Sequence, residues 1–176
     1  MMLTPGLRKF VLTAHVISSV GFLGAVAGFL VLAVAGLASQ DAQTVRAAYL
    51  AMELIAWFVI VPLAFTSLVI GIVQSLTSQW GLFRYWWVLA KLVLTVLTVT
   101  VLLLQLEPIG YVARAAAEGT LSSADLRGLR TSFVWPHGTG GLLVLFLTTT
   151  LSVYKPRGMT RYGWGKQHEQ RPLSQP

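Results

Sequence analysis

Residues 10–37 read FVLTAHVISSVGFLGAVAGFLVLAVAGL, a run of 28 residues without one aspartate, glutamate, lysine or arginine. A helix of about 20 apolar residues crosses the roughly 30 Å hydrocarbon core of a bilayer, and a buried helix of a soluble protein is seldom so long. The apolar core of a cleaved signal sequence is also shorter, at roughly 7–15 residues. The stretch therefore predicts a membrane-spanning helix that the mature protein keeps.

Three further apolar stretches follow, at about residues 48–75, 84–106 and 132–154. Apart from Arg84 at the very start of one stretch, the charged or histidine residues inside them are Glu53, Lys91 and His137, one in each stretch. In hydrocarbon every backbone N–H and C=O needs a partner, which a helix supplies within the segment. We therefore predict an all-α fold, a transmembrane four-helix bundle over residues 1–155. An outer loop over 107–131, with short surface helices at Tyr111–Glu118 and near 122–129, and a flexible basic tail over 156–176 complete this prediction.

The overall composition agrees with a membrane protein. It is 55% hydrophobic and 11% charged, with a mean hydropathy of +0.70, which excludes an ordinary soluble globule and a disordered chain. Thirteen basic against six acidic residues would suggest nucleic acid in a soluble protein. Here the basic residues cluster beside the ends of the apolar stretches, where they meet anionic lipid. The predicted partner is thus the lipid bilayer and not nucleic acid.

Lysine and arginine residues are divided unequally between the two sides of the predicted bundle. Eight lie in the N-terminal segment, the loop near residues 77–84 and the C-terminal tail, and four lie in the two loops on the other side. The positive-inside rule then places both termini in the cytoplasm. We predict a multi-pass protein of the plasma membrane, of bacterial type. Pro62 lies inside the second stretch and is expected to kink that helix.

The ionisable residues inside the stretches fall at two depths. His15 and Lys91 lie at a similar depth, roughly 8–9 Å inside the cytoplasmic ends of their helices, so they are expected to meet. Glu53 and His137 lie at a similar shallow depth on the other side and are expected to form a second pair. Such residues are functional candidates because an ionisable group costs about 2.5–3.5 kcal/mol or more at the bilayer centre. Snorkelling of Lys91 toward water and a structural Glu53–His137 pair stay open as alternatives.

Two further patterns concern helix packing. Lys91, Thr95, Thr98 and Gln105 share one face of the third stretch at helical spacing, which we interpret as a packing face. Gly24 and Gly28 form the small-xxx-small pattern by which membrane helices associate. This pattern is also what a second copy of the chain, or another subunit of a membrane complex, would use.

Recognisable catalytic arrangements are missing from the sequence. It contains no Ser-His-Asp set, nucleotide-binding loop, HExxH pattern or paired catalytic carboxylates, so no catalytic residue is predicted. The chain has no cysteine for a thiolate metal site. Since His15 and His137 are expected on opposite sides of the bilayer, they cannot bind one metal ion.

Two segments resemble a known family. They are His15-x6-Phe22-x-Gly24 and Trp86-Trp87-Val88-Leu89-Ala90-Lys91, to which the ending at 151–158 adds. With these segments the chain resembles small, uncharacterised bacterial integral membrane proteins related to the copper-resistance D (CopD) domain. It is more distantly similar to HemJ-type protoporphyrinogen oxidases, which bind haem and use a His and a Lys in corresponding helices.

The resemblance implies a cofactor site. His15 would be a haem ligand or redox-site residue, and Lys91 would hold a porphyrin propionate or act as a base. Copper is the other cofactor that the resemblance implies. Beside haem or copper binding, two other functions stay open: a small transporter with Glu53, Lys91 and His137 along its path, and an accessory or structural subunit of a membrane complex.

Overall fold

A computed structural model describes residues 4–78, 81–118, 135–156 and 158–169, without the side chains of 135–138 and 168–169. Its helices are α1 (Pro5–Ala38), α2 (Ala42–Ile55), the π-helix η1 (Ala56–Ile60), α3 (Val61–Thr77), α4 (Trp86–Glu118), α6 (Trp135–Tyr154) and α7 (Arg161–Glu169). Three helices are long and apolar enough to cross a membrane: α1, the continuous helix formed by α2, η1 and α3, and α4. The α6 helix adds a shorter apolar stretch over Thr139–Tyr154. The predicted all-α fold with long apolar helices is confirmed.

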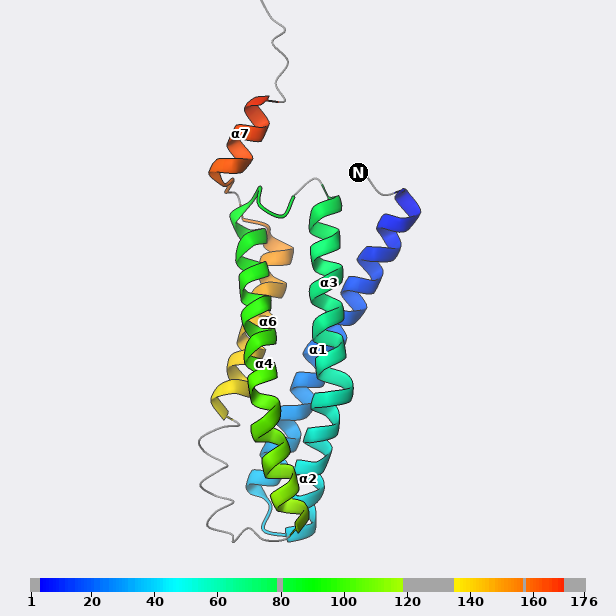
Figure 1. The fold of residues 1–176 in the computed structure, drawn as a ribbon, viewed down its shortest axis with the longest axis vertical. Coiled ribbons are helices and arrows are strands. Elements are labelled where there is room, and N and C mark those ends of the chain that lie inside the picture. The colour runs from blue at the N-terminus through cyan, green and yellow to red at the C-terminus, as the bar shows by residue number, and fades with distance from the viewer. Residues whose placement is uncertain (1–3, 79–80, 119–134, 157, 170–176) are drawn as a thin grey trace, which may run out of the picture.

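The long helices run side by side (Figure 1). The α1 helix packs against α2, α3 and α6, and α4 packs against α2, α3 and α6. We call the end where α1 begins, α3 ends and α4 begins the proximal end. The other end, which holds the start of α2 and the end of α4, is the distal end.

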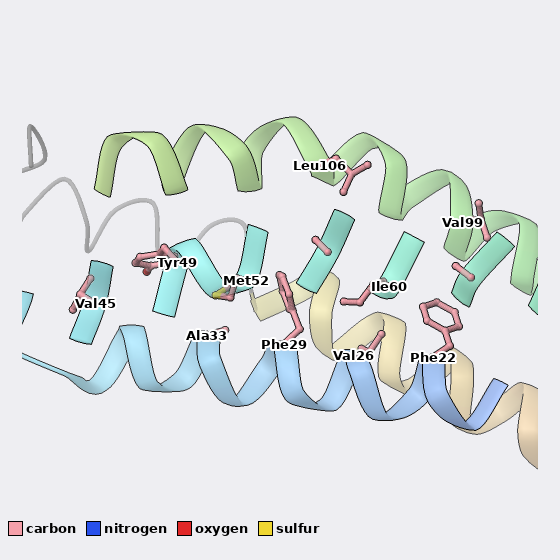
Figure 2. Packing of buried hydrophobic residues seen from close by; sticks show 12 residues of the cluster. Phe22, Val26, Phe29, Ala33, Val45, Tyr49, Met52, Ile60, Val99 and Leu106 are labelled. Atoms are coloured by element: carbon pink, nitrogen blue, oxygen red, sulfur yellow. The ribbon is translucent and has the colours of Figure 1, made fainter. Parts of the chain in front are cut away.

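The core lies where α1, α2–η1–α3 and α4 face one another. In Figure 2, Phe22, Val26 and Phe29 of α1 point into the space between these helices. The full set of buried hydrophobic residues in this cluster is Phe22, Val26, Phe29, Ala33, Val45, Tyr49, Met52, Ala56, Ile60, Ala64, Val99 and Leu106. On α1 they recur every three or four residues, which places them on one helix face. In lipid such interfaces are held by close packing rather than by removal of apolar surface from water.

The π-helical turn at Ala56–Ile60 keeps one face of α2–η1–α3 directed at the core. Met52, Ala56, Ile60 and Ala64 are spaced four residues apart and are between 0% and 3% exposed. In a regular α-helix three such steps would drift by about 120°, because one turn takes 3.6 residues. Wider turns remove this drift, and the Val61 N–H accordingly bonds to the Ala56 carbonyl five residues earlier. The expected distortion at Pro62 thus takes the form of a π-helical turn just before it.

The α4 helix extends further than expected. The predicted end of the third helix at residue 106 is wrong, because the helix continues through Pro108 to Glu118. Tyr111–Glu118 is helical as predicted, but it is part of α4 and not a separate surface helix of an outer loop. Pro108 removes one backbone hydrogen bond, but Gly110 and Ala113 are buried beyond it, and this part of α4 packs against α2. Tertiary packing therefore outweighs the proline. The remaining loop residues 119–131, with the expected helix near 122–129, lie outside the described residues.

A helix also replaces part of the expected flexible tail. Thr160 anchors it: its backbone N–H donates to the Arg84 carbonyl at 3.0 Å, and its hydroxyl donates to the Phe83 carbonyl at 2.6 Å. The same hydroxyl accepts a hydrogen bond from the Gly163 N–H at 3.1 Å, which caps α7. The prediction of irregular structure is therefore wrong over Arg161–Glu169. Residues 157 and 170–176 of the tail lie outside the described residues.

Asp41 caps the start of α2 outside the membrane-spanning helices. Its carboxylate accepts hydrogen bonds from the Thr44 hydroxyl at 2.7 Å, the Thr44 N–H at 2.9 Å and the Gln43 N–H at 3.4 Å. These bonds favour the charged form, so they lower the pKa of Asp41, with the Thr44 hydroxyl as the main cause.

This cap predicts a pH dependence. Because the folded-state pKa is lowered, the stabilisation is complete above the ordinary aspartate value of about 3.9 and is lost as the pH falls through the lowered pKa. In an NMR titration, the Thr44 amide proton shift should change with a midpoint below that ordinary value. In Asp41→Asn, which keeps an acceptor oxygen, this transition should disappear. A midpoint at or above the ordinary value would contradict the cap.

Candidate functional site

A layer of polar side chains lies near the proximal end, where α1, α3 and α4 meet. The His15 imidazole lies against the backbone of α3, with Cε1 3.0 Å from where a Cβ of Gly71 would be. The hydroxyls of Ser19 and Ser67 form a hydrogen bond of 2.8 Å between α1 and α3. The Lys91 ammonium is close enough to interact electrostatically with His15. The structure thus brings His15 and Lys91 into one layer.

Two atoms in this part of the protein are buried without a hydrogen-bond partner among the described residues, His15 Nδ1 and Gln74 Oε1. Lys91 Nζ lies 5.4 Å from the centre of the Trp87 ring, a cation–π contact. Sequence reasoning missed Gln74, although it lies one turn beyond Gly71 and at helical spacing would share its face. The layer therefore contains a cation, Lys91, and an imidazole, His15, with one ring nitrogen that has no partner among the described residues.

The packing of His15 does not single out a haem site. Its Cε1 lies 3.0 Å from where a Cβ of Gly71 would be, so α3 borders this edge of the ring. Copper or another metal would need further ligands, and no group of three or more His, Cys, Asp or Glu is assembled within residues 4–78, 81–118, 135–156 and 158–169. The roles that the family resemblance implies for His15 and Lys91 gain no support from this packing.

Near the distal end, Glu53 packs against α4. Its Oε1 lies 3.1 Å from where a Cβ of Gly110 would be, and the Arg114 guanidinium reaches within 3.6 Å of the same point. The absence of a side chain at Gly110 therefore lets an acid and a base approach the same stretch of α4. The backbone of His137 belongs to α6, but its side chain lies outside the described residues, so the expected Glu53–His137 pair stays a prediction.

Arg114 could not be found as a neighbour of Glu53 while the third helix was expected to end at residue 106. Gly110 and Arg114 are four residues apart and share a face once α4 is extended past Pro108. The contact could therefore be predicted only if α4 was known to continue as a helix past Pro108.

The paired glycines of α1 make no contact within the described part of the chain. No atom lies within 4 Å of the positions that Cβ atoms of Gly24 and Gly28 would take. Both residues are exposed, as are Ile17, Val20 and Val31. Association of this face with a second copy or another membrane protein stays a prediction.

An apolar cavity of about 280 Å³ lies between α1, α2–η1, α4 and α6. Its polar lining residues are Tyr49, Thr98 and Gln105, and the other lining residues are apolar or glycine: Phe22, Val26, Phe29, Met52, Ala56, Ile60, Leu97, Val101, Leu102, Pro108, Ile109, Val112, Gly140, Gly141, Val144 and Leu145. His15, Lys91 and Glu53 do not line it. Thr98 and Gln105 were expected on a packing face, and they lie on the cavity wall.

The fold defines an all-helical protein with three helical lengths that are long and apolar enough to cross a membrane. No protein-family model, curated protein or solved structure matches this chain. The resemblance to CopD-related and HemJ-type proteins therefore stays a prediction from the segments around His15 and Lys91.

Proposed function

We propose that the protein is a membrane-embedded binding protein that holds a lipid-soluble small molecule inside a transmembrane four-helix bundle. The observation that carries this proposal is the apolar cavity of about 280 Å³ with three polar residues on its wall. Ligand pockets in proteins are mostly apolar clefts of about 300–1,000 Å³ with a few polar groups that fix the ligand's orientation. At about 280 Å³ the cavity is slightly smaller than this range, which suits a small ligand.

The polar residues on the wall suggest what kind of molecule would bind. The Thr98 hydroxyl donates to the Leu94 carbonyl at 2.8 Å, so toward a ligand it can act only as an acceptor. The Gln105 amide offers a donor and an acceptor, and the Tyr49 phenol offers either. A compact apolar molecule with one or two polar groups matches this arrangement. Among the side chains that the structure describes, no histidine lines the cavity to ligate a porphyrin.

For the membrane and orientation we propose the bacterial-type plasma membrane with both termini in the cytoplasm. The excess of lysine and arginine in the N-terminal segment, the loop near 77–84 and the tail supports this orientation. The start of α1 and the α7 helix lie at the same end of the molecule (Figure 1), as this orientation requires.

Gly141→Leu tests the proposed cavity. Gly141 lines it, and no atom lies within 4 Å of the position of its missing Cβ, so a leucine has room to enter the cavity without disturbing the helices. We expect the fraction of protein that carries the bound molecule to fall at least about tenfold, because the leucine side chain occupies the same volume. Native mass spectrometry of protein purified in detergent, with solvent extraction to identify the bound mass, measures this loss.

Gly24→Leu is the matched control. It places the same side chain in another spanning helix, where a Cβ also has open space, but Gly24 does not line the cavity. This variant should retain the molecule as the wild type does. Equal retention in Gly141→Leu, or a wild-type protein without any bound lipid-soluble molecule, would contradict the proposed function.

A further inference from the structure

A second hollow lies at the proximal end, on the surface. It is a recess of about 320 Å³ between the segment that joins α3 to α4 and the α7 helix. On the side of the segment that joins α3 to α4, the recess is lined by the apolar residues Leu76, Leu82 and Phe83 and by Arg84. Tyr162 and Lys166 line it from α7. The recess therefore combines apolar surface with two cations.

Hydrogen bonds hold the two sides of the recess together. Besides the bonds from the Thr160 hydroxyl to the Phe83 carbonyl and from the Thr160 N–H to the Arg84 carbonyl, the Trp86 N–H donates to the Gly158 carbonyl at 3.2 Å. Tyr85 and Met159 pair as an antiparallel bridge. Because these contacts fix the start of α7, Lys166 is held on the same recess as Arg84. The site is thus built by the fold and does not depend on a chance approach of a loose tail.

The charges of the recess lack an acidic counterpart among its lining residues. Arg84 Nε is buried and has no hydrogen-bond partner among the described residues. An arginine donor that is withdrawn from water needs an acceptor, and guanidinium groups match the oxygens of phosphate particularly well. Two basic residues on one recess without an acidic lining residue, one of them with a buried donor that lacks a partner among the described residues, therefore point to a bound anion.

The position of the recess identifies the source of that anion. The recess lies between the end of α3 at Thr77 and the start of α4 at Trp86, two helices proposed to span the membrane. Phe83, Trp86, Tyr162 and Trp164 around it are each more than half exposed, and tryptophan and tyrosine are enriched at the interface between membrane and water. Leu76, on the recess wall, is also exposed. An anion with an attached apolar chain fits this place better than a free one.

We propose that this recess binds the phosphate-bearing headgroup of an anionic membrane phospholipid, with Arg84 and Lys166 on the phosphate. The apolar surface of Leu76 and Phe83 contacts the start of an acyl chain. Basic sites at the cytoplasmic ends of membrane helices recognise anionic lipids in this way. The site is separate from the apolar cavity inside the protein.

Lipid titration of the full-length protein in detergent tests this site. Native mass spectrometry should detect one phosphatidylglycerol bound to the wild type at a concentration about tenfold lower than phosphatidylcholine requires, since the latter carries no net charge. Arg84→Gln and Lys166→Gln should each weaken the phosphatidylglycerol complex by about tenfold. Arg161→Gln removes the same charge from α7 at an exposed residue that does not line the recess, so this control should bind as the wild type does.

Three outcomes would overturn the proposal. One is equal binding of phosphatidylglycerol by the wild type and by Lys166→Gln, an exposed residue whose substitution leaves folding intact. A second is an equal loss in Arg161→Gln, which would show a general charge effect. The third is displacement of the lipid by inorganic phosphate at equal concentration, which would assign the recess to a free anion. A melting curve for Arg84→Gln separates lost binding from lost folding, and Lys166→Gln decides the result if Arg84→Gln unfolds.

Discussion

Replacing Ala64 by leucine should destabilise the protein by about 1–3 kcal/mol, the usual cost of forcing extra carbon atoms into a well-packed core. Ala64 is 0% exposed and belongs to the cluster that joins α1, α2–η1–α3 and α4. In lipid, small residues of this kind let helices approach closely, so the added side chain would push α3 away from its neighbours. The free energy of unfolding, measured by far-ultraviolet circular dichroism during titration with a denaturing detergent, reports this change.

Ala90→Leu is the matched control for this substitution. Ala90 lies in the spanning part of α4, but it is exposed on the outer surface of the helices. There a leucine meets only lipid, and surface substitutions usually change stability by less than about 0.5 kcal/mol. If Ala64→Leu unfolded at the same detergent concentration as Ala90→Leu, the described contact between these helices would be wrong.

Gly163→Leu should detach α7 from the proximal end. A Cβ at this position would overlap the carbonyl oxygen of Arg84 and would lie 3.1 Å from the Cγ of Arg84. The overlapped atom belongs to the backbone, so it cannot turn aside as the end of a side chain would. We expect loss of the anchoring bonds of Thr160, at about 1 kcal/mol for each hydrogen bond. Amide hydrogen exchange over residues 158–166 should then become about tenfold faster or more.

The matched control is Gly165→Leu, two residues further along the same helix. No atom lies within 4 Å of the Cβ position of Gly165, so this variant changes the helix propensity in the same way without the overlap. It should exchange at the wild-type rate. Faster exchange in both variants would mean that the intrinsic stability of α7, and not its contact with Arg84, controls this segment.

The long helices could be predicted because their evidence is local. The run at residues 10–37 lies within α1 (Pro5–Ala38), since a helix through lipid needs only length and apolar composition. The end of α4 could not be predicted in this way. Pro108 is a local signal for termination, whereas burial of Gly110 and Ala113 depends on contact with a helix more than 50 residues earlier in the chain.

The same difference between local signals and long-range contacts decides which parts of the candidate sites could be predicted. Equal depth along two helices was enough to anticipate that His15 and Lys91 lie close enough to interact electrostatically. The apolar cavity could not be anticipated, because it depends on the volumes that side chains from four helical lengths leave unfilled. The recess beside Arg84 depends on hydrogen bonds from Thr160 to a segment about 76 residues away, for which the sequence carries no periodic signal.

The π-helical turn at Ala56–Ile60 sets the rotational phase between the two halves of the second spanning helix. Deleting one residue there would rotate the distal half by about 100° relative to the proximal half. Tyr49 and Met52 would then leave the cavity wall, while Ser67 would keep its bond to Ser19. At the exposed positions of this turn, Trp57, Phe58 and Val59, the protein can therefore tolerate changes of residue type far more readily than a change in its length.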